Sequence, residues 1–251
     1  DMLDIQLDDR ALFLERWRGL LLDLLREEER SANPGRKAFY ELIREDWTGR
    51  ASVDSAGYRL VRTFRSFTDE KVFECLFRPC READDRFRHF SFTQREQPLW
   101  LLVTRRPLHL LDPGYRSWEE FLLAVVDETV EYFEGADSLK DHTWGERNTV
   151  RIRHPISRAI PFLASWLDMP PVQLPGDSNM PRFQGPSSGA SERLAVSPGR
   201  EADGYFHMPA GQSGHPMSSY YRAGHEDWVE GRPSSFLPGP AEKVLHLLPR
   251  D

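Results

Sequence analysis

Two stretches decide the fold class of this chain: Asp177-Ser178-Asn179-Met180-Pro181 and, further on, Pro209-Ala210-Gly211-Gln212-Ser213-Gly214-His215-Pro216. Both consist of turn-forming residues, and both lie in a region from His154 onward that holds 14 of the chain's 19 prolines. Proline and glycine at this density favour loops over helices. Short apolar pieces lie between these loops and predict strands at 150–152, 193–197, 204–208 and 243–248.

The region before these loops has a helical period instead. Apolar residues between Leu14 and Leu25 recur at three- and four-residue steps and predict a helix over 8–30. The run Asn33-Pro34-Gly35 is expected to end that helix, and a second helix is expected over 37–46.

Capping signals mark two further helices. Ser66 with Asp69 three residues on predicts a helix start, and Pro79 predicts its end. Ser117 followed by Glu120 predicts a reciprocal cap, after which apolar residues line one side of the helix. The pattern therefore predicts an α+β protein with a helical amino-terminal lobe. The expected parts are a mainly helical region, residues 1–136, and a strand-and-loop region, residues 137–251, within one structural unit.

The composition indicates a globular protein and argues against nucleic-acid binding and membrane spans. Of the 251 residues 39% are apolar and 29% are charged, which is typical of a globular domain. The formal net charge of −7 argues against a nucleic-acid binder, because phosphate binding needs an excess of Lys and Arg. No apolar run approaches the ~20 residues that span a bilayer. The acidic start at Asp1 is unlike a signal peptide, so we expect a part of a longer, processed protein.

The two cysteines carry little functional information. Cys75 and Cys80 are separated by four residues, which is neither a zinc-ligand nor a redox spacing, and two ligands cannot close a zinc site. If Pro79 breaks the helix between them, a local disulfide can form. Two buried free thiols fit the sequence equally well.

The stretch 211–215 is similar to the nucleophile elbow of serine hydrolases. That motif needs G-x-S-x-G between a strand and a helix, but here the fifth residue is His215, and Pro216 disfavours a helix. The preferred interpretation is a tight glycine loop in which Gln212 and Ser213 hydrogen-bond to the backbone.

Histidines near acids or hydroxyl residues leave a catalytic triad open, because its members need only meet in space. They are His89, His142, His207, His215 and His225. The pair His225-Glu226 lacks the second histidine of a zinc protease motif. Residues 177–179 lack the alternating oxygen ligands of a calcium loop. We therefore expect no metal to be held by this chain alone.

In order and spacing, the tail resembles the carboxy-terminal end of the penicillin acylase (penicillin amidase) family of N-terminal-nucleophile hydrolases. The segments that carry the resemblance are 176–181, 190–193, 197–199, 209–216 and the run Tyr221-Arg222…His225…Trp228…Gly231. Weaker matches precede them at Asp4 to Asp8, Asp46-Trp47-Thr48-Gly49 with Asp54-Ser55, Thr143-Trp144-Gly145 and His154-Pro155.

The resemblance implies a four-layer αββα sandwich, to which this chain contributes the later part of the β chain. Members cleave the amide of N-acylated substrates, of β-lactam or acyl-homoserine-lactone type, with an amino-terminal Ser as nucleophile and its amine as base. Here the first residue is Asp1, so we expect the chain alone to be inactive. The nucleophile, the oxyanion-hole Asn and the calcium ligands would lie upstream, and none is assigned to Ser213 or Asn179.

For this chain the resemblance assigns no catalytic residue and no cofactor. Gln212, Ser213, Gly214 and His215 are expected to support the cleft. The expected partners are the α chain, the first part of the β chain and a small N-acyl substrate, in the periplasm or outside the cell. Open sheet edges would favour a homodimer. The alternatives are a non-catalytic binding or interaction domain that kept the fold, and a serine hydrolase that uses Ser213.

Overall fold

The structure, a computed structural model, describes residues 2–88, 93–241 and 244–249. It divides into two compact units. Residues Asp9–Asn148 form one, called the helical unit, and Asp1–Asp8 together with Thr149–Asp251 form the other, called the tail unit. The helical unit is thus inserted in the sequence of the tail unit. The division into 1–136 and 137–251 stays a prediction.

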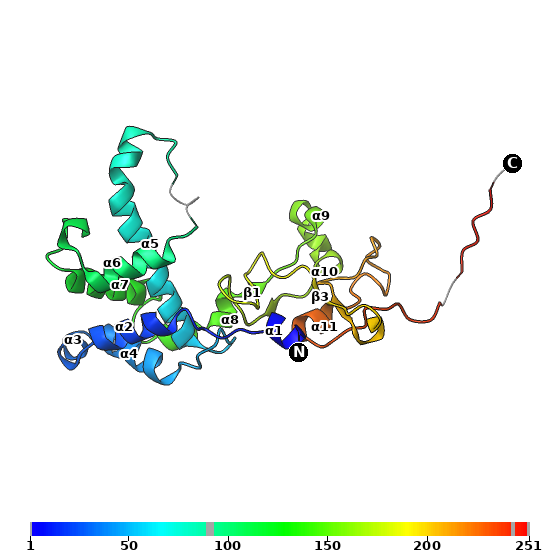
Figure 1. The fold of residues 1–251 in the computed structure, drawn as a ribbon, viewed down its shortest axis with the longest axis horizontal. Helices are drawn as coiled ribbons and strands as arrows, with labels where there is room; N and C mark the ends of the chain where they lie inside the picture. Colours follow the sequence, from blue (N-terminus) through cyan, green and yellow to red (C-terminus); the bar gives the residue numbers. More distant parts are fainter. Residues whose placement is uncertain (1, 89–92, 242–243, 250–251) are drawn as a thin grey trace. The chain divides into compact units, whose positions relative to one another are not determined.

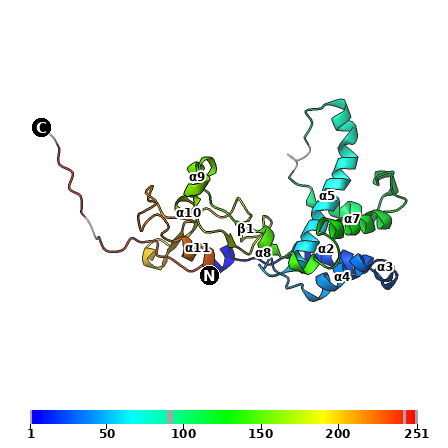
Figure 2. The same ribbon diagram turned by 180° about the vertical axis from the view of Figure 1, so that it is seen from behind.

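The helical unit is built around one long helix. Its elements are α2 (Glu15–Leu24), α3 (Glu27–Ala32), α4 (Pro34–Glu45), α5 (Ala56–Ala83), α6 (Glu96–Arg105), η2 (Leu108–Leu110), α7 (Trp118–Tyr132), η3 (Leu139–Asp141) and α8 (Trp144–Arg147). Helix α5 packs against α2, α4 and α7, and both views show α7 beside it (Figures 1 and 2). Gly57 permits the close approach of α4, because a Cβ there would lie 2.9 Å from Leu42 O.

The first predicted helix is split in two, so the expectation of one helix over 8–30 is wrong. The backbone leaves helical geometry at Leu25, whose ψ is 67°. Three glutamates then begin α3, where the positive end of a helix dipole stabilises them. Asn33 ends α3 and starts α4, because its Oδ1 accepts from Gly35 N at 2.8 Å. The predicted second helix is therefore confirmed, with an earlier start.

The predicted limits of the third helix are also wrong. The cap of α5 is Ser55, whose Oγ accepts from Tyr58 N at 3.0 Å, whereas Ser66 lies inside the helix and donates to Arg62 O at 2.9 Å. Pro79 does not end it either. It lies near the exposed end of α5, where the loss of one hydrogen bond destabilises little.

The cap at Ser117 is confirmed, with one difference. Ser117 Oγ accepts from Glu120 N at 3.0 Å, but the Glu120 carboxylate accepts from Arg116 N at 2.9 Å. Helix α6 was not predicted, because its buried face consists of only Leu99 and Val103. The helical unit thus owes its longest elements to packing more than to end signals.

The tail unit contains short helices and two-stranded sheets between loops. Its elements are α1 (Met2–Gln6), β1 (Thr149–Val150), α9 (Pro155–Ala159), η4 (Pro161–Leu163), α10 (Ala164–Leu167), β2 (Val172–Gln173), β3 (Arg193–Ala195), η5 (Glu201–Asp203), β4 (Tyr205–His207) and α11 (His225–Glu230). Helix α1 lies beside α11 in both views, and Leu7 occupies the space next to Gly231 (Figures 1 and 2).

Both sheets are antiparallel. Strand β1 pairs with β2, and β3 pairs with β4, with Arg193 opposite His207 and Ala195 opposite Tyr205. The strands predicted over 193–197 and 204–208 are confirmed in shortened form, as β3 and β4. The strand predicted over 150–152 shares only Val150 with β1, and β2 was not predicted. The fourth predicted strand is wrong where the structure describes it, because 244–248 has no strand pairing, and Lys243 lies outside the described residues. The short helices after His154 were not predicted, since each is too brief for a periodic pattern.

Helices in one unit and small antiparallel sheets in the other give the predicted α+β class. Both cysteines are free, with Cys75 half-buried and Cys80 exposed on α5. Continuous helix between them turns the two side chains to different faces. In the described ranges, no helix has both the length and the apolarity needed to cross a membrane.

Candidate functional site

Trp228 is the centre of the tail unit and joins segments that are far apart in sequence. It belongs to α11, is buried, and packs with Val150 and Leu174 in a small apolar core. Its indole Nε1 donates to Ala190 O at 2.7 Å. Two of the segments quoted from the sequence, 190–193 and the run that ends at Gly231, therefore meet at this side chain.

Arg193 contacts both the backbone and the side chain of Trp228. Its Nη1 donates to Trp228 O at 2.8 Å, and its Cζ lies 5.4 Å from the centroid of the indole. Burial, together with the charge of Arg182, lowers the pKa of Arg193 to about 10. This guanidinium is held by a carbonyl and an aromatic face, which makes it a structural cation that orders the Trp228 backbone.

Two histidines extend this arrangement toward the loops. The ring of His225 stacks on Trp228 with centroids 6.2 Å apart, and its Nδ1 donates to Pro209 O at 2.7 Å. His207 faces Arg193 across the β3–β4 ladder, and its Nε2 donates to Arg232 O. Burial lowers the pKa of His207, so its ring is neutral at pH 7. Each ring thus donates one nitrogen to a backbone carbonyl and braces the loop that begins at Pro209 or Arg232, while the other nitrogen, His207 Nδ1 or His225 Nε2, is buried without a hydrogen-bond partner among the described residues.

The predicted loop of Gln212, Ser213, Gly214 and His215 lies at the surface. Gln212, Gly214 and His215 are exposed and Ser213 is half-buried. Ser213 Oγ accepts from His215 N at 3.2 Å, while His215 Nδ1 accepts from Met217 N at 3.1 Å. The Nδ1 nitrogen of His215 therefore cannot at the same time accept a proton from Ser213.

Gly211 sets the path of this loop. Its N donates to Tyr221 O at 3.1 Å, and a Cβ on Gly211 would lie 1.8 Å from Tyr220 O. These contacts agree with the interpretation of a tight glycine loop. They leave the role of the four loop residues in supporting a cleft as a prediction.

The stretch 177–181 is also a structural turn. Asp177 N donates to Arg182 O at 3.2 Å, and the Asp177 carboxylate accepts from Ser178 N at 2.6 Å. Gly176 precedes it with φ of +106°, and a Cβ there would lie 2.3 Å from Arg182 O. Asn179 is exposed and donates from Nδ2 to Ser178 Oγ at 3.3 Å. Glycine is thus required at this turn by both conformation and space.

A second junction forms in the helical unit from the weaker motifs. Ser55 Oγ donates to Asp46 O at 2.9 Å, and Asp46 Oδ2 accepts from Gly57 N at 2.8 Å. Trp144 N donates to Ser55 O at 3.0 Å, and its indole meets Tyr58 edge to face. The residues that resemble the family here therefore tie the start of α5 to α8.

The remaining histidines do not face a serine through their hydrogen-bonded nitrogens. His142 Nδ1 lies 3.2 Å from Glu146 Oε2, and His154 Nδ1 accepts from Ile156 N at 3.1 Å. His89 lies outside the described residues. His142, His154, His207, His215 and His225, which the structure describes, each have a backbone or carboxylate partner, as expected of residues that order loops.

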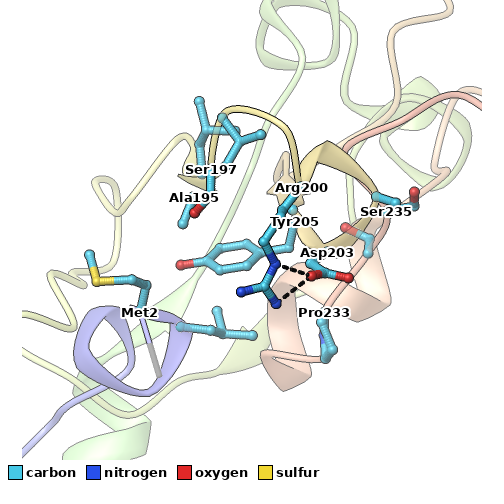
Figure 3. Close-up of a pocket in the computed structure, with 14 residues that line it drawn as sticks. Met2, Ala195, Ser197, Arg200, Asp203, Tyr205, Pro233 and Ser235 are labelled. Carbon is cyan, nitrogen blue, oxygen red and sulfur yellow. Dashed lines mark hydrogen bonds and ion pairs between the residues drawn. The ribbon is translucent and has the colours of Figure 1, made fainter.

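The tail unit also contains a cavity of about 970 Å³ that the sequence did not signal (Figure 3). Its walls come from α1, β3, the loop to η5, and 233–235. Tyr205 lines it and donates from its hydroxyl to Gln6 Oε1 at 3.0 Å, while Arg200 and Asp203, which also line it, pair with each other.

The chemistry of this cavity suits binding more than catalysis. Burial raises the pKa of Tyr205, which keeps the hydroxyl protonated at neutral pH. Ser234 and Ser235 donate their hydroxyls to Phe206 O and Leu237 O. No alternation of apolar and polar residues along 204–208 could have placed Tyr205 inside the unit, because the apolar Phe206 is the exposed residue of β4.

Comparison with known proteins places these observations in a family. No curated protein matches the chain. A family model described as Penicillin amidase matches residues 1–242, which is nearly the whole chain. The match includes the residues around Trp228 in the tail unit and those that join Ser55 to Trp144 in the helical unit. The chain therefore belongs to the penicillin amidase family.

Proposed function

We propose that this chain is the carboxy-terminal part of the β chain of a penicillin-acylase-like enzyme, which hydrolyses the amide of N-acylated substrates of β-lactam or acyl-homoserine-lactone type. The family match over residues 1–242 carries the proposal. The tail unit would complete the outer part of a four-layer αββα sandwich. A periplasmic or secreted location follows from the same family.

The geometry supports a scaffolding role for this chain within the enzyme. Arg193, His207 and His225 are bound to backbone carbonyls, and the hydrogen bonds of Ser213 and His215 close turns of the loop. The nucleophilic Ser, the oxyanion-hole Asn and the calcium ligands would belong to the preceding part of the β chain and the α chain. No metal or cofactor is assigned to this chain.

The test is hydrolysis of phenylacetyl and long-chain acyl chromogenic amides by the 251-residue chain and by the complete gene product. We expect turnover by the complete product alone. Ser213→Ala in the complete product should leave kcat/KM unchanged, because Ser213 Oγ serves a backbone turn. Turnover by the 251-residue chain that Ser213→Ala abolishes, with fluorophosphonate labelling of the unsubstituted chain, would instead assign the chemistry to the loop at 211–215.

A binding domain without catalysis is the second candidate, and the cavity of about 970 Å³ favours it. In that case the complete product would not turn over any amide, yet an N-acyl ligand would raise the Tm of the 251-residue chain. Tyr205→Phe should weaken that shift, because it removes from the cavity lining the hydroxyl that donates to Gln6.

A further inference from the structure

One segment of the tail unit, residues 155–167, leaves large apolar side chains exposed. It comprises α9, η4 and α10, which pack on one another. Ser157 is the buried residue of the segment, at 5% exposed, whereas Phe162 is 75% exposed and Trp166 is 56% exposed. Side chains of this size normally face the core of a domain. Their exposure indicates that another surface covers this segment.

The exposed apolar residues form two pairs at helical spacing. Ile156 and Ile160 are one turn apart, and Ile160 N donates to Ile156 O at 2.8 Å. Phe162 and Trp166 are also four residues apart, along η4 and α10. Residues four apart share a side of a helical turn, so each pair forms a continuous apolar strip.

Hydrogen bonds at both ends of the segment hold it to the tail unit. The exposed apolar side chains are therefore presented by an ordered segment. Asp168 Oδ1 accepts from Ser157 Oγ at 2.5 Å and from His154 N at 2.9 Å. From the other side, Tyr221 donates its hydroxyl to Leu167 O at 2.6 Å. Arg222 Nη2 donates to Asp168 O at 3.0 Å. These bonds tie both ends of the segment to the unit.

More positive than negative charge lies beside this apolar face. Residues 149–167 contain Arg151, Arg153 and Arg158 and no Asp or Glu, in a chain whose net charge is −7, and the carboxylate that follows, Asp168, already accepts from Ser157 and His154. Arg151 and Arg153, together with Arg222, line a cavity of about 320 Å³ beside α10. A partner that fits here has apolar side chains at its centre and carboxylates at its edge.

The apolar core of the tail unit is small, and the exposed apolar face is not part of it. Its buried apolar cluster consists of Val150, Leu174 and Trp228, with Ile152, Val172 and Val229 against it. A lipid surface would fit the exposed aromatic and basic residues, but it would not fill the concave space between Arg153 and α10. A folded protein surface can fill it, which favours a protein occupant.

We propose that this face, defined by Ile156, Ile160, Phe162 and Trp166 with Arg151, Arg153 and Arg158, is the docking surface for the remainder of the acylase polypeptide. This inference rests on the proposed function, because that function supplies the occupant. It goes beyond that function in naming the surface and the chemistry of its complement: an apolar centre with a carboxylate rim.

Hydroxyl-radical footprinting of the complete gene product and of the 251-residue chain tests this placement. We expect oxidation of Phe162 and Trp166 to be severalfold slower in the complete product. Trp228 should be protected in both samples, which shows that the tail unit is folded. Equal oxidation of Phe162 and Trp166 in the two samples would overturn the proposal.

Variants separate docking from folding. Phe162→Glu with Trp166→Glu in the complete product should lower its Tm and make Ile156 and Ile160 as reactive as in the 251-residue chain. The matched control is Leu108→Glu, an exposed apolar residue of the helical unit, which should change neither. Arg151→Glu with Arg153→Glu should also lower the Tm and raise the oxidation of Ile156 and Ile160, but by less. No loss of protection in the Phe162/Trp166 variant would contradict the proposal, provided that Trp228 stays protected.

The outcomes distinguish this inference from the proposed function. Amide turnover by the complete product without protection of Phe162 and Trp166 would retain the function and reject the docking surface. Protection without turnover would retain the surface and reject the function. Protection of the 251-residue chain by phosphatidylglycerol vesicles alone would show a lipid occupant, and protection that appears only with dimerisation would show a second copy. Either result would overturn the proposal.

Discussion

The guanidinium of Arg193 lies over the indole of Trp228, 5.4 Å from Cζ to the ring centroid, and donates to the carbonyl of the same residue at 2.8 Å. One arginine thus contacts both the side chain and the backbone of the residue around which the tail unit is packed. Its burial and the nearby charge of Arg182 lower its pKa to about 10, so the charge itself is costly there.

This arrangement predicts an unusual order of stability among variants. Arg193→Lys should destabilise more than Arg193→Met, because lysine keeps a buried charge but loses the contact of the guanidinium with the Trp228 indole. Urea unfolding, followed by the fluorescence of the tail unit, measures the two midpoints. The reverse order would mean that the hydrogen bond to Trp228 O outweighs the burial of charge.

The buried ring of His207 predicts loss of stability in acid. Its folded pKa is lowered from 6.5, mainly by burial, so the unfolded state binds the proton more strongly. The contribution of His207 is fully present above pH 6.5 and is lost as the pH falls below that value toward the folded pKa. His207→Gln should flatten this part of the curve of unfolding free energy against pH. An unchanged slope in the variant would show that another group titrates.

The loop at 211–215 contains a matched pair of glycines. Gly211→Ala would place a Cβ 1.8 Å from Tyr220 O, whereas a Cβ on Gly214 meets nothing within 4 Å. We expect Gly211→Ala to lower the free energy of unfolding by about 1–3 kcal/mol, as overpacking does. Gly214→Ala should be close to neutral. Thermal unfolding of the two variants side by side measures the difference, and equal Tm values would show that the loop can move away.

In the helical unit, the Glu96 carboxylate accepts hydrogen bonds from three side chains, two on α2 and one on α5. Arg16 Nη2 at 2.6 Å and Trp17 Nε1 at 2.8 Å bind its Oε1, and Arg65 Nε lies 2.9 Å from its Oε2. Burial raises the pKa of Glu96, but these donors and the charge of Arg65 outweigh burial, and the pKa is lowered.

We therefore expect Glu96→Gln to lower the free energy of unfolding by about 1 kcal/mol at neutral pH, a figure that allows for the partial exposure of the carboxylate. The contribution of Glu96 is present above its unfolded pKa of 4.5 and is lost as the pH falls through the folded value, so variant and parent should converge in acid. Glu119→Gln, at a more distant ion pair, is the control. A difference that persists unchanged in acid would assign the effect to packing instead of charge.

A structural feature could be predicted from the sequence where its hydrogen-bond partners lie close together along the chain. The cap at Ser117 and the turn at Asn33 were predictable, because each partner lies within three residues. The start of α5 was not, because Ser55 is held by Asp46 O and by Trp144 N, whose positions depend on tertiary packing.

In the candidate site too, local features were predictable and long-range contacts were not. Glycines at 211 and 214 were sufficient to predict a tight loop. No local pattern predicts that Ala190 O binds the indole of Trp228 or that His225 binds Pro209 O. The exposed apolar segment at 155–167 was not predicted, because its helices are too short for a periodic pattern and apolar residues are otherwise assigned to a core.

The insertion of the helical unit has a consequence for engineering. The chain passes into that unit after Asp8 and returns before Thr149. At the first link, Asp8 O accepts from Arg182 N within the tail unit, and Asp9 O accepts from Ala51 N within the helical unit. Because these neighbouring carbonyls are satisfied on their own sides, the chain is organised as a host domain, the tail unit, with a guest domain inserted in its sequence, and Asp8 and Thr149 mark where a replacement linker would be joined.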